Sequence, residues 1–299
     1  MKSLAWLASS WKWPIAIALM GAIAYGGICL YLFARQNRFI FFPTRAIHTS
    51  PADYGVAYED IWLDIPDNRK GERIHGWWLP HPEGERPTGV LLYLHGNGSN
   101  VGANLEAALR FREFGFSVLL VDYRGYGRSQ GDFPTETSVY RDAERAWDYL
   151  TRERGIQPGE IFIYGHSLGG AVAIDLAARN PNAAGAIVEA SFTSMRDMVD
   201  YQYPFFQVFP VDFLLTHEFD SLSKVRTLNM PILFVHGARD AVVPASMSAR
   251  LYDAAPEPKR LLMIPEADHH NIGAIARERY FKAMEDLVAI TNPLEAKNP

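Results

Sequence analysis

The chain has 299 residues, of which 48% are hydrophobic and 21% are charged, with a formal net charge of −5. This length suits one large domain or one domain with an appendage, and the mild acidity offers no basic footprint for nucleic acid. Cys29 is the one cysteine, and no cluster of cysteine and histidine has the spacing of zinc ligands. We therefore expect no internal disulfide, no metal, no cofactor and no nucleic-acid partner.

An apolar helix is predicted over residues 14–34, because this stretch of about 21 residues carries no charge and is long enough to cross a bilayer core. The alternative is a cleaved signal peptide, but the apolar run continues about ten residues past the small-residue site at residues 22–24. Ile28 also stands before Cys29, where a lipoprotein signal requires a small residue. Aromatic residues flank the stretch, as they do at membrane interfaces: Trp6, Trp11, Trp13, Tyr31, Phe33, Phe39, Phe41 and Phe42.

We predict from this stretch a single-pass membrane protein with an N-terminal flank (1–13), an anchor (14–34) and a linker (35–54). Basic residues lie on both sides of the anchor, so the positive-inside rule does not decide which side of the membrane holds the main domain. The main domain is expected over 55–290, with a polar tail over 291–299.

Strand and helix patterns alternate through the main domain at βαβ lengths, which predicts a mostly parallel sheet with helices on both faces. The first two strands, joined by a turn at residues 66–68, are expected to be the antiparallel exception. The predicted strands cover 56–63, 73–80, 89–94, 117–121, 161–164, 184–190, 231–236 and 260–264. The predicted helices cover 104–114, 136–152, 171–178, 244–254 and 272–290.

A Gly-x-Ser-x-Gly pattern at residues 165–169 lies between a buried strand and a helix of small and apolar residues. This context is that of a nucleophile elbow, which lifts the Ser167 hydroxyl out of the sheet. Gly165 and Gly169 fit because a side chain in so sharp a turn would meet the neighbouring backbone. The N–H of Leu168, at the helix start, is a candidate donor to an oxyanion.

A serine nucleophile needs a base and an orienting acid, which should follow later strands of the sheet. Asp240 follows the strand over 231–236, and the strand over 260–264 leads to two adjacent histidines, His269 and His270. We expect His269 to be the base because its loop length fits better, with His270 as the alternative. Glu189 is a rival acid, although a strand-end carboxylate with local hydrogen bonds is the simpler interpretation, and Asp268 is expected to be only a neighbour.

The loop after the strand over 89–94 should supply the second oxyanion donor. Gly96 and Gly98 let its backbone turn, and the Asn97 N–H is the natural partner of the Leu168 N–H. His95 is expected to hold this loop rather than to act as a base.

Residues 195–230 interrupt the alternation of strand and helix, and they are rich in aromatic rings. A connection of this length is typically functional or disordered, and the composition does not indicate disorder. It is interpreted either as a short cap that supplies an apolar pocket or as a crossover whose rings pack on the sheet, and one segment can do both.

These motifs together resemble the α/β-hydrolase superfamily over about residues 55–290. The anchor and cap are similar to those of membrane-anchored serine hydrolases, which include lipid esterases and depalmitoylase-like enzymes. The resemblance implies an eight-stranded, mostly parallel sheet, Ser167 as nucleophile, Asp240 as acid, His269 as base, and Asn97 and Leu168 as oxyanion donors. The motifs that carry it are His95-Gly96-Asn97-Gly98, Asp122-Tyr123-Arg124-Gly125-Tyr126-Gly127, Gly165-His166-Ser167-Leu168-Gly169-Gly170, His236-Gly237-x-x-Asp240 and Asp268-His269.

The first functional hypothesis is a membrane-tethered serine hydrolase that cleaves an ester or thioester of an apolar, lipid-like acyl group through an acyl-enzyme. A peptidase of the same fold, aminopeptidase-like, is the alternative within the enzymes. A non-catalytic binding protein that keeps the fold is the alternative from another class, because one fold hosts many functions.

Overall fold

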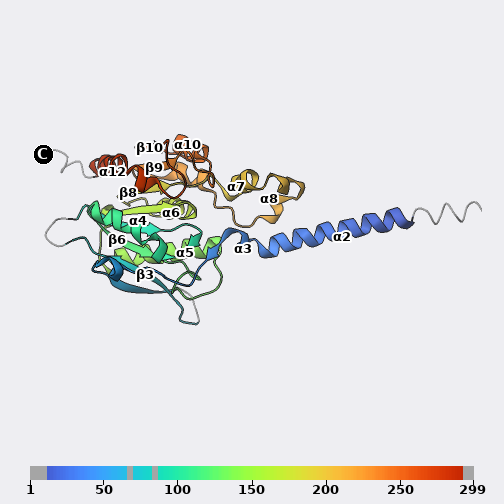
Figure 1. Cartoon of the computed structure of the whole chain (residues 1–299), viewed down its shortest axis with the longest axis horizontal. Helices are drawn as coiled ribbons and strands as arrows, with labels where there is room; N and C mark the ends of the chain where they lie inside the picture. Colours follow the sequence, from blue (N-terminus) through green and yellow to red (C-terminus); the bar gives the residue numbers. More distant parts are fainter. Residues whose placement is uncertain (1–11, 66–69, 83–86, 292–299) are drawn as a thin grey trace, which may run out of the picture.

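The computed structural model describes residues 12–65, 70–82 and 87–291 (Figure 1). The turn expected at residues 66–68, the flanking Trp6 and Trp11, and the tail from residue 292 lie outside the described residues.

One eight-stranded sheet forms the centre of the domain, with the order β10-β9-β8-β7-β4-β6-β3-β2. The predicted α/β architecture is thus confirmed. The pairings of β3 with β2 and with β6 are both antiparallel and all others in the sheet are parallel, so β3 alone runs against the other strands. The expectation that both of the first two strands are exceptions is therefore wrong for β2. The strands are β2 (Glu59–Asp64), β3 (Arg73–Leu79), β4 (Gly89–Leu94), β6 (Phe116–Val121), β7 (Ile161–His166), β8 (Gly185–Glu189), β9 (Ile232–Gly237) and β10 (Lys259–Ile264).

Helices cover both faces of the sheet and divide the core into two clusters. On one face α4 (Val101–Glu113) and α12 (Arg277–Thr291) contribute buried side chains. On the other face the layer consists of α5 (Glu136–Asp148), α6 (Leu168–Arg179) and α10 (Ala245–Ala254). Buried helical side chains on both faces explain why the central strands are apolar almost throughout.

Two predicted helices differ in detail from the structure. The helix expected over 136–152 ends at Asp148 and continues as a wider turn, η2 (Tyr149–Glu153). The helix expected over 272–290 is divided into α11 (Ile272–Ile275) and α12, with Ala276 between them. Hydrophobic periodicity does not register such local breaks, because the buried positions continue on both sides of them.

The apolar N-terminal helix α2 (Lys12–Arg35) projects from the domain and buries none of its residues (Figure 1). Its most apolar window has a mean hydropathy of 2.1, so by length and composition α2 can span a membrane, a test that a signal sequence also passes.

The residues after α2, expected to be a linker, pack closely on the domain. They form α3 (Asn37–Ile40), the short strand β1 (Phe42–Pro43), which pairs with β5 (Gly98–Ser99), and the turn η1 (Pro51–Tyr54). The Asn100 side chain donates hydrogen bonds to the carbonyl oxygens of Thr44 and Ala46 at 3.2 and 2.7 Å. These contacts fix the segment that follows α2 relative to the sheet.

The long connection between β8 and β9 forms short helices on the side of the domain from which α2 extends (Figure 1). Residues 195–214 of this connection are called the cap below. The helices of the connection are α7 (Met195–Gln202), η4 (Pro204–Val208), α8 (Val211–Leu214), α9 (Ser221–Lys224) and η5 (Val225–Thr227).

Candidate active site

Ser167 lies at the turn between β7 and α6, with φ 55° and ψ −121°. A left-handed φ at a residue with a side chain is strained, and here it is held by hydrogen bonds on both sides. The Ser167 N–H donates to the Glu189 carbonyl at 2.8 Å, and the Ser167 carbonyl accepts from the Ser191 hydroxyl at 2.9 Å.

The two glycines of the elbow have no room for a side chain. A Cβ on Gly165 would lie 2.0 Å from the carbonyl oxygen of Gly169, and a Cβ on Gly169 would lie 2.1 Å from that of Leu94. Strand β7, the first turn of α6 and the end of β4 therefore approach closely because both residues are glycine.

The structure brings Asp240 and His269 together. Nδ1 of His269 lies 2.6 Å from Oδ2 of Asp240, and both side chains are buried. The second carboxylate oxygen of Asp240 accepts the N–H groups of Val242 and Val243, each at 2.8 Å. This arrangement leaves Nε2 of His269 as the ring nitrogen that is free to act as a base.

His236 contacts the Asp240 carboxylate as well. Its Nε2 lies 3.1 Å from Oδ2 of Asp240 and its Nδ1 lies 2.6 Å from the Ser248 hydroxyl. Burial raises the pKa of Asp240, but the hydrogen bonds from His236, His269 and the Val243 N–H more than offset this effect, so the pKa is lowered. Asp240 is therefore a carboxylate at neutral pH.

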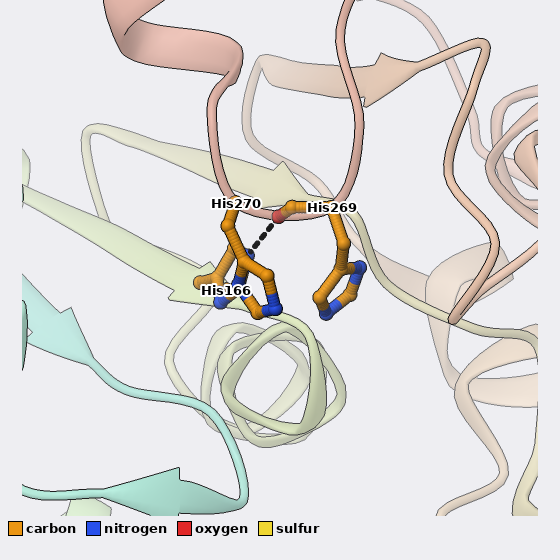
Figure 2. Close-up of side chains that lie close together, drawn as sticks. All are labelled: His166, His269 and His270. Carbon is orange, nitrogen blue, oxygen red and sulfur yellow. Dashed lines mark hydrogen bonds between the residues drawn. The ribbon is translucent and has the colours of Figure 1, made fainter.

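The loop that carries His269 lies directly beside the elbow (Figure 2). Nε2 of His166, the residue before Ser167, donates to the His269 carbonyl oxygen at 3.0 Å. Burial, followed by repulsion from the His269 ring, lowers the pKa of His166 to about 3. His166 is thus neutral at neutral pH, and its hydrogen bond connects the loop of His269 to the turn that holds Ser167.

The side chain of His270 lies next to that of His269 (Figure 2), but His270 is exposed. Its ring centroid is 4.8 Å from that of His269, and its N–H donates to Asp268 at 2.9 Å. The carboxylate of Asp240 is paired with His269 rather than with His270. The geometry therefore favours the first of the two candidate bases.

One ring nitrogen from each of His166, His269 and His270 lies within 4.8 Å of the others (Figure 2), so the three rings have the ligand types of a transition-metal site. Two of these rings already use a nitrogen in a hydrogen bond to the protein. An ion bound here would take the Nε2 lone pair of His269, which a base needs.

Asn97 lies in the loop between β4 and β5 and is held from two sides. Its carbonyl oxygen accepts from the Tyr126 hydroxyl at 2.7 Å and from the Phe42 N–H at 2.9 Å. Its side-chain amide donates to the Ile40 carbonyl at 3.0 Å. Asn97, Ser167 and Leu168 border the same cavity, so the structure brings both expected donor residues to the nucleophile.

The rejected candidates have structural partners. Nδ1 of His95 lies 2.7 Å from the Gly96 carbonyl, and the buried ring of His95 packs between Tyr123 and Tyr126, as expected for a residue that holds the loop. Oε2 of Glu189 accepts from the Tyr280 hydroxyl at 2.7 Å. The carboxylate of Asp268 accepts N–H groups of its own loop, from His270 and Asn271.

A cavity of about 460 Å³ opens above Ser167. Its floor consists of Asn97, Ser167 and Leu168, and none of the described residues that line it is charged. One wall comes from the cap, and the opposite wall comes from the end of α2, from α3 and from β1. A cavity of this size and composition fits a small apolar ligand.

Sequence reasoning did not assign roles to His236, Ser248, His166 or the α2–α3 wall. His236 and His166 stand at strand ends within quoted motifs, and the signal that could have found them is a polar residue in an otherwise apolar strand. The wall residues carry no such signal, because Gln36 and Asn37 find their partners about 180 positions away in the chain.

Three comparisons place this geometry among known proteins. A family model described as serine aminopeptidase, S33, matches residues 85–223. An uncharacterized protein of Mycobacterium tuberculosis is 32% identical over 257 residues, which cover 86% of this chain and 88% of that protein. Protein bem46 of Schizosaccharomyces pombe is 30% identical over 280 residues, or 90% of this chain and 91% of bem46.

Among solved structures, an esterase of Pyrococcus furiosus, Pf2001, superimposes with a TM-score of 0.67 at 18% identity, over 84% of this chain and 97% of the esterase. At this identity the likeness shows the fold alone, which is that of an α/β hydrolase. WAV2 of Arabidopsis thaliana, an alpha/beta hydrolase domain-containing protein, is 30% identical over 253 residues, which cover 79% of this chain and 80% of WAV2. The chain therefore belongs to the α/β-hydrolase superfamily.

Proposed function

We propose that the protein is a membrane-anchored serine hydrolase that cleaves a carboxylic ester or a thioester with an apolar acyl group. The observation that carries this proposal is the buried pair of Asp240 and His269, 2.6 Å apart, beside a strained serine that faces an uncharged cavity. A carboxylate, an imidazole and an elbow serine are the parts that activate a weak hydroxyl nucleophile.

In the proposed reaction, the Ser167 hydroxyl attacks the acyl carbon while Nε2 of His269 takes its proton. Asp240 accepts the Nδ1–H of His269, which orients the ring and stabilises the imidazolium. The N–H groups of Leu168 and Asn97 stabilise the negative oxygen of the tetrahedral intermediate, and each donor is worth about 2.7–4 kcal/mol. The leaving group departs with the proton from His269, and water then hydrolyses the acyl-enzyme by the same steps.

The membrane part of the proposal rests on α2. It is long and apolar enough to span a bilayer, and it buries no residue against the domain. The chain continues from α2 directly into α3 and β1, which pack beside Asn97. An anchor in this position would hold the cavity next to the membrane.

A peptidase is the second candidate, because the matching family model is described as a serine aminopeptidase. An aminopeptidase has to recognise a charged α-amino group, and an acidic side chain near the serine is the usual partner for such a cation. The described lining of the cavity has no carboxylate. This composition favours an acyl chain over a peptide N-terminus.

The test is a substrate panel on the full chain in detergent micelles. The panel contains nitrophenyl esters, acyl thioesters and aminoacyl amides, and Ser167→Ala serves as the matched control. The proposal expects hydrolysis of the esters or thioesters, with an initial burst that marks an acyl-enzyme, and none by the variant. Activity confined to the amides would favour the peptidase, and no activity on any class would favour the binding protein.

A further inference from the structure

The end of the anchor helix is part of the cavity above Ser167. Leu32 of α2 and Gln36, which follows its last residue, border a cavity of about 460 Å³ together with residues of the cap. Phe39, Ile40 and Phe42 continue the same wall. A helix that served only as a tether would have no reason to border the catalytic serine. The composition of this wall is apolar apart from Gln36.

Hydrogen bonds fix this wall to the end of the cap and to the residues that follow it. The Gln36 side chain donates to the Leu214 carbonyl at 3.2 Å and accepts from the Thr216 N–H at 2.8 Å. His217 is hydrogen-bonded to the Asn37 side chain. The relative position of α2 and the cap is therefore specified by several polar contacts.

The cap also contacts α2 at Tyr25, further from the domain. The Tyr25 hydroxyl donates to the Val208 carbonyl at 2.9 Å, and the Tyr25 ring stacks on Phe209 with centroids 5.4 Å apart. Tyr25 lies ten residues before Arg35, which corresponds to about 15 Å along a helix axis. If α2 spans the bilayer, this contact lies about halfway into a hydrocarbon core of about 30 Å.

The outer surface of the cap carries the apolar side chains that contact with the hydrocarbon core requires. Phe205 and Phe213 are 63% and 88% exposed, and Val208 is 70% exposed. Exposed apolar side chains concentrated in so short a segment are typical of a membrane contact. Charged side chains of the cap are paired, Arg196 with Asp200 and Asp212, and Asp197 with Arg250, which lowers the cost of a less polar environment.

We propose that the cap and α2 together form an entrance within the bilayer, through which a lipid acyl chain reaches Ser167 without passing through water. The substrate class is then the acyl ester or thioester of a membrane-resident lipid or lipid-modified molecule. The acyl chain of the substrate occupies the space between α2 and the cap, and α2 limits the length of acyl chain that fits. This inference rests on the proposed hydrolase function.

The first test changes the wall of the cavity. Leu32→Trp places a bulky ring in the space for the acyl chain. Leu30→Trp is the matched control, because Leu30 is on the same helix, is 67% exposed and does not border the cavity. The readout is the ratio of kcat/KM for a dodecanoyl ester to that for an acetyl ester, measured on the full chain in lipid nanodiscs. Each methylene displaced from an apolar site costs about fourfold.

We expect Leu32→Trp to lower this ratio about tenfold or more and Leu30→Trp to leave it unchanged. An unchanged ratio in Leu32→Trp, with normal labelling by a fluorophosphonate probe, would overturn the role of α2 as a wall. If the unaltered protein hydrolyses no ester and reacts with no such probe, the proposed hydrolase function is wrong. The measurement of depth described next then tests the position of the cap in the bilayer independently of catalysis.

The second test measures depth and needs no catalysis. Phe205→Cys, in a Cys29→Ala background, carries an environment-sensitive fluorophore in vesicles of phosphatidylcholine whose acyl chains bear nitroxide quenchers. Lys282→Cys is the control, because Lys282 lies on α12, at the other end of the domain from the cap (Figure 1). Strong quenching at position 205 and none at position 282 is expected, and equal, weak quenching at both positions would overturn the bilayer entrance.

Discussion

Nδ1 of His269 lies 2.6 Å from Oδ2 of Asp240, although the two residues are 29 positions apart in the chain. Asp240 follows β9 and His269 follows β10, and these neighbouring strands are parallel, so their carboxyl ends deliver both residues to one edge of the sheet. The same edge carries Ser167 at the end of β7. Three distant parts of the chain therefore meet where a nucleophile, a base and an acid are needed together.

The two adjacent histidines should differ sharply in their contribution to catalysis. His269→Ala is expected to lower kcat/KM about a thousandfold or more, because it removes the group that takes the serine proton. His270→Ala is expected to stay within about threefold, since its ring is exposed and has no bond to Asp240. Steady-state kinetics on one nitrophenyl ester compare the two. A large loss in His270→Ala alone would assign the base to His270.

Asp240 should contribute to stability in a pH-dependent way. The pKa of Asp240 is lowered in the folded protein. Its stabilising effect is therefore present at pH values above the pKa of an aspartate in the unfolded chain, about 4, and is lost as the pH falls towards the pKa in the folded protein. The difference in unfolding free energy between the native protein and Asp240→Asn should therefore be constant from about pH 8 to pH 5 and should narrow below about pH 4. Urea unfolding at several pH values measures it, and a difference that widens towards acid would contradict the ionised pair.

Gly165→Ala should destabilise the elbow by at least about 2 kcal/mol, because the new Cβ would lie 2.0 Å from the Gly169 carbonyl oxygen. Gly159→Ala is the control, since a Cβ at this position, just before β7, would meet no atom within 4 Å. Urea unfolding measures both variants. Equal stability of the two would mean that the elbow relaxes more easily than its packing indicates.

Glu189→Gln separates the rival acid from Asp240. Burial raises the pKa of Glu189, although its hydrogen bond from Tyr280 opposes this shift. With a raised pKa, the folded protein has its full stability at pH values below the pKa of the group in the unfolded chain. Stability is then lost as the pH rises through the pKa of the group in the folded protein. The amide introduced by Glu189→Gln does not ionise, so the variant avoids this loss while its side-chain oxygen can still accept from Tyr280.

The expected result for Glu189→Gln is unchanged kcat/KM and a melting temperature at pH 8 that is no lower than that of the native protein, with any advantage shrinking towards pH 4. Thermal unfolding and ester hydrolysis check both. A loss of activity as large as that of Asp240→Asn would make Glu189 the orienting acid.

The sheet and the elbow could be predicted from sequence because each depends on a local pattern. Ser167, Asp240 and His269 each follow an apolar strand. In a parallel sheet the carboxyl ends of these strands lie at one edge, so the sequence predicts that the three residues are neighbours. Loop length favoured His269 over His270 as the base, but adjacent residues in a loop differ mainly in side-chain direction, which the sequence does not give. The partner of Asp240 in the structure supplies that direction.

The packing of the segment that follows α2 was beyond sequence reasoning for a different reason. Asn97 binds the carbonyl oxygen of Ile40, and Asn100 binds those of Thr44 and Ala46. Any residue has a carbonyl group, so the sequence over 35–54 shows no pattern that distinguishes a packed segment from a free linker. His236 is similar, because its two polar contacts form only when β9 and α10 come together.

The most direct measurement of the central claim is mapping of the residue that reacts with a fluorophosphonate probe, by mass spectrometry of digested protein. We predict a single adduct on Ser167 in the native protein, none in Ser167→Ala, and a strongly slowed reaction in His269→Ala. Equal labelling of the native protein and Ser167→Ala, or an adduct on another serine, would contradict the assignment of Ser167 as the nucleophile.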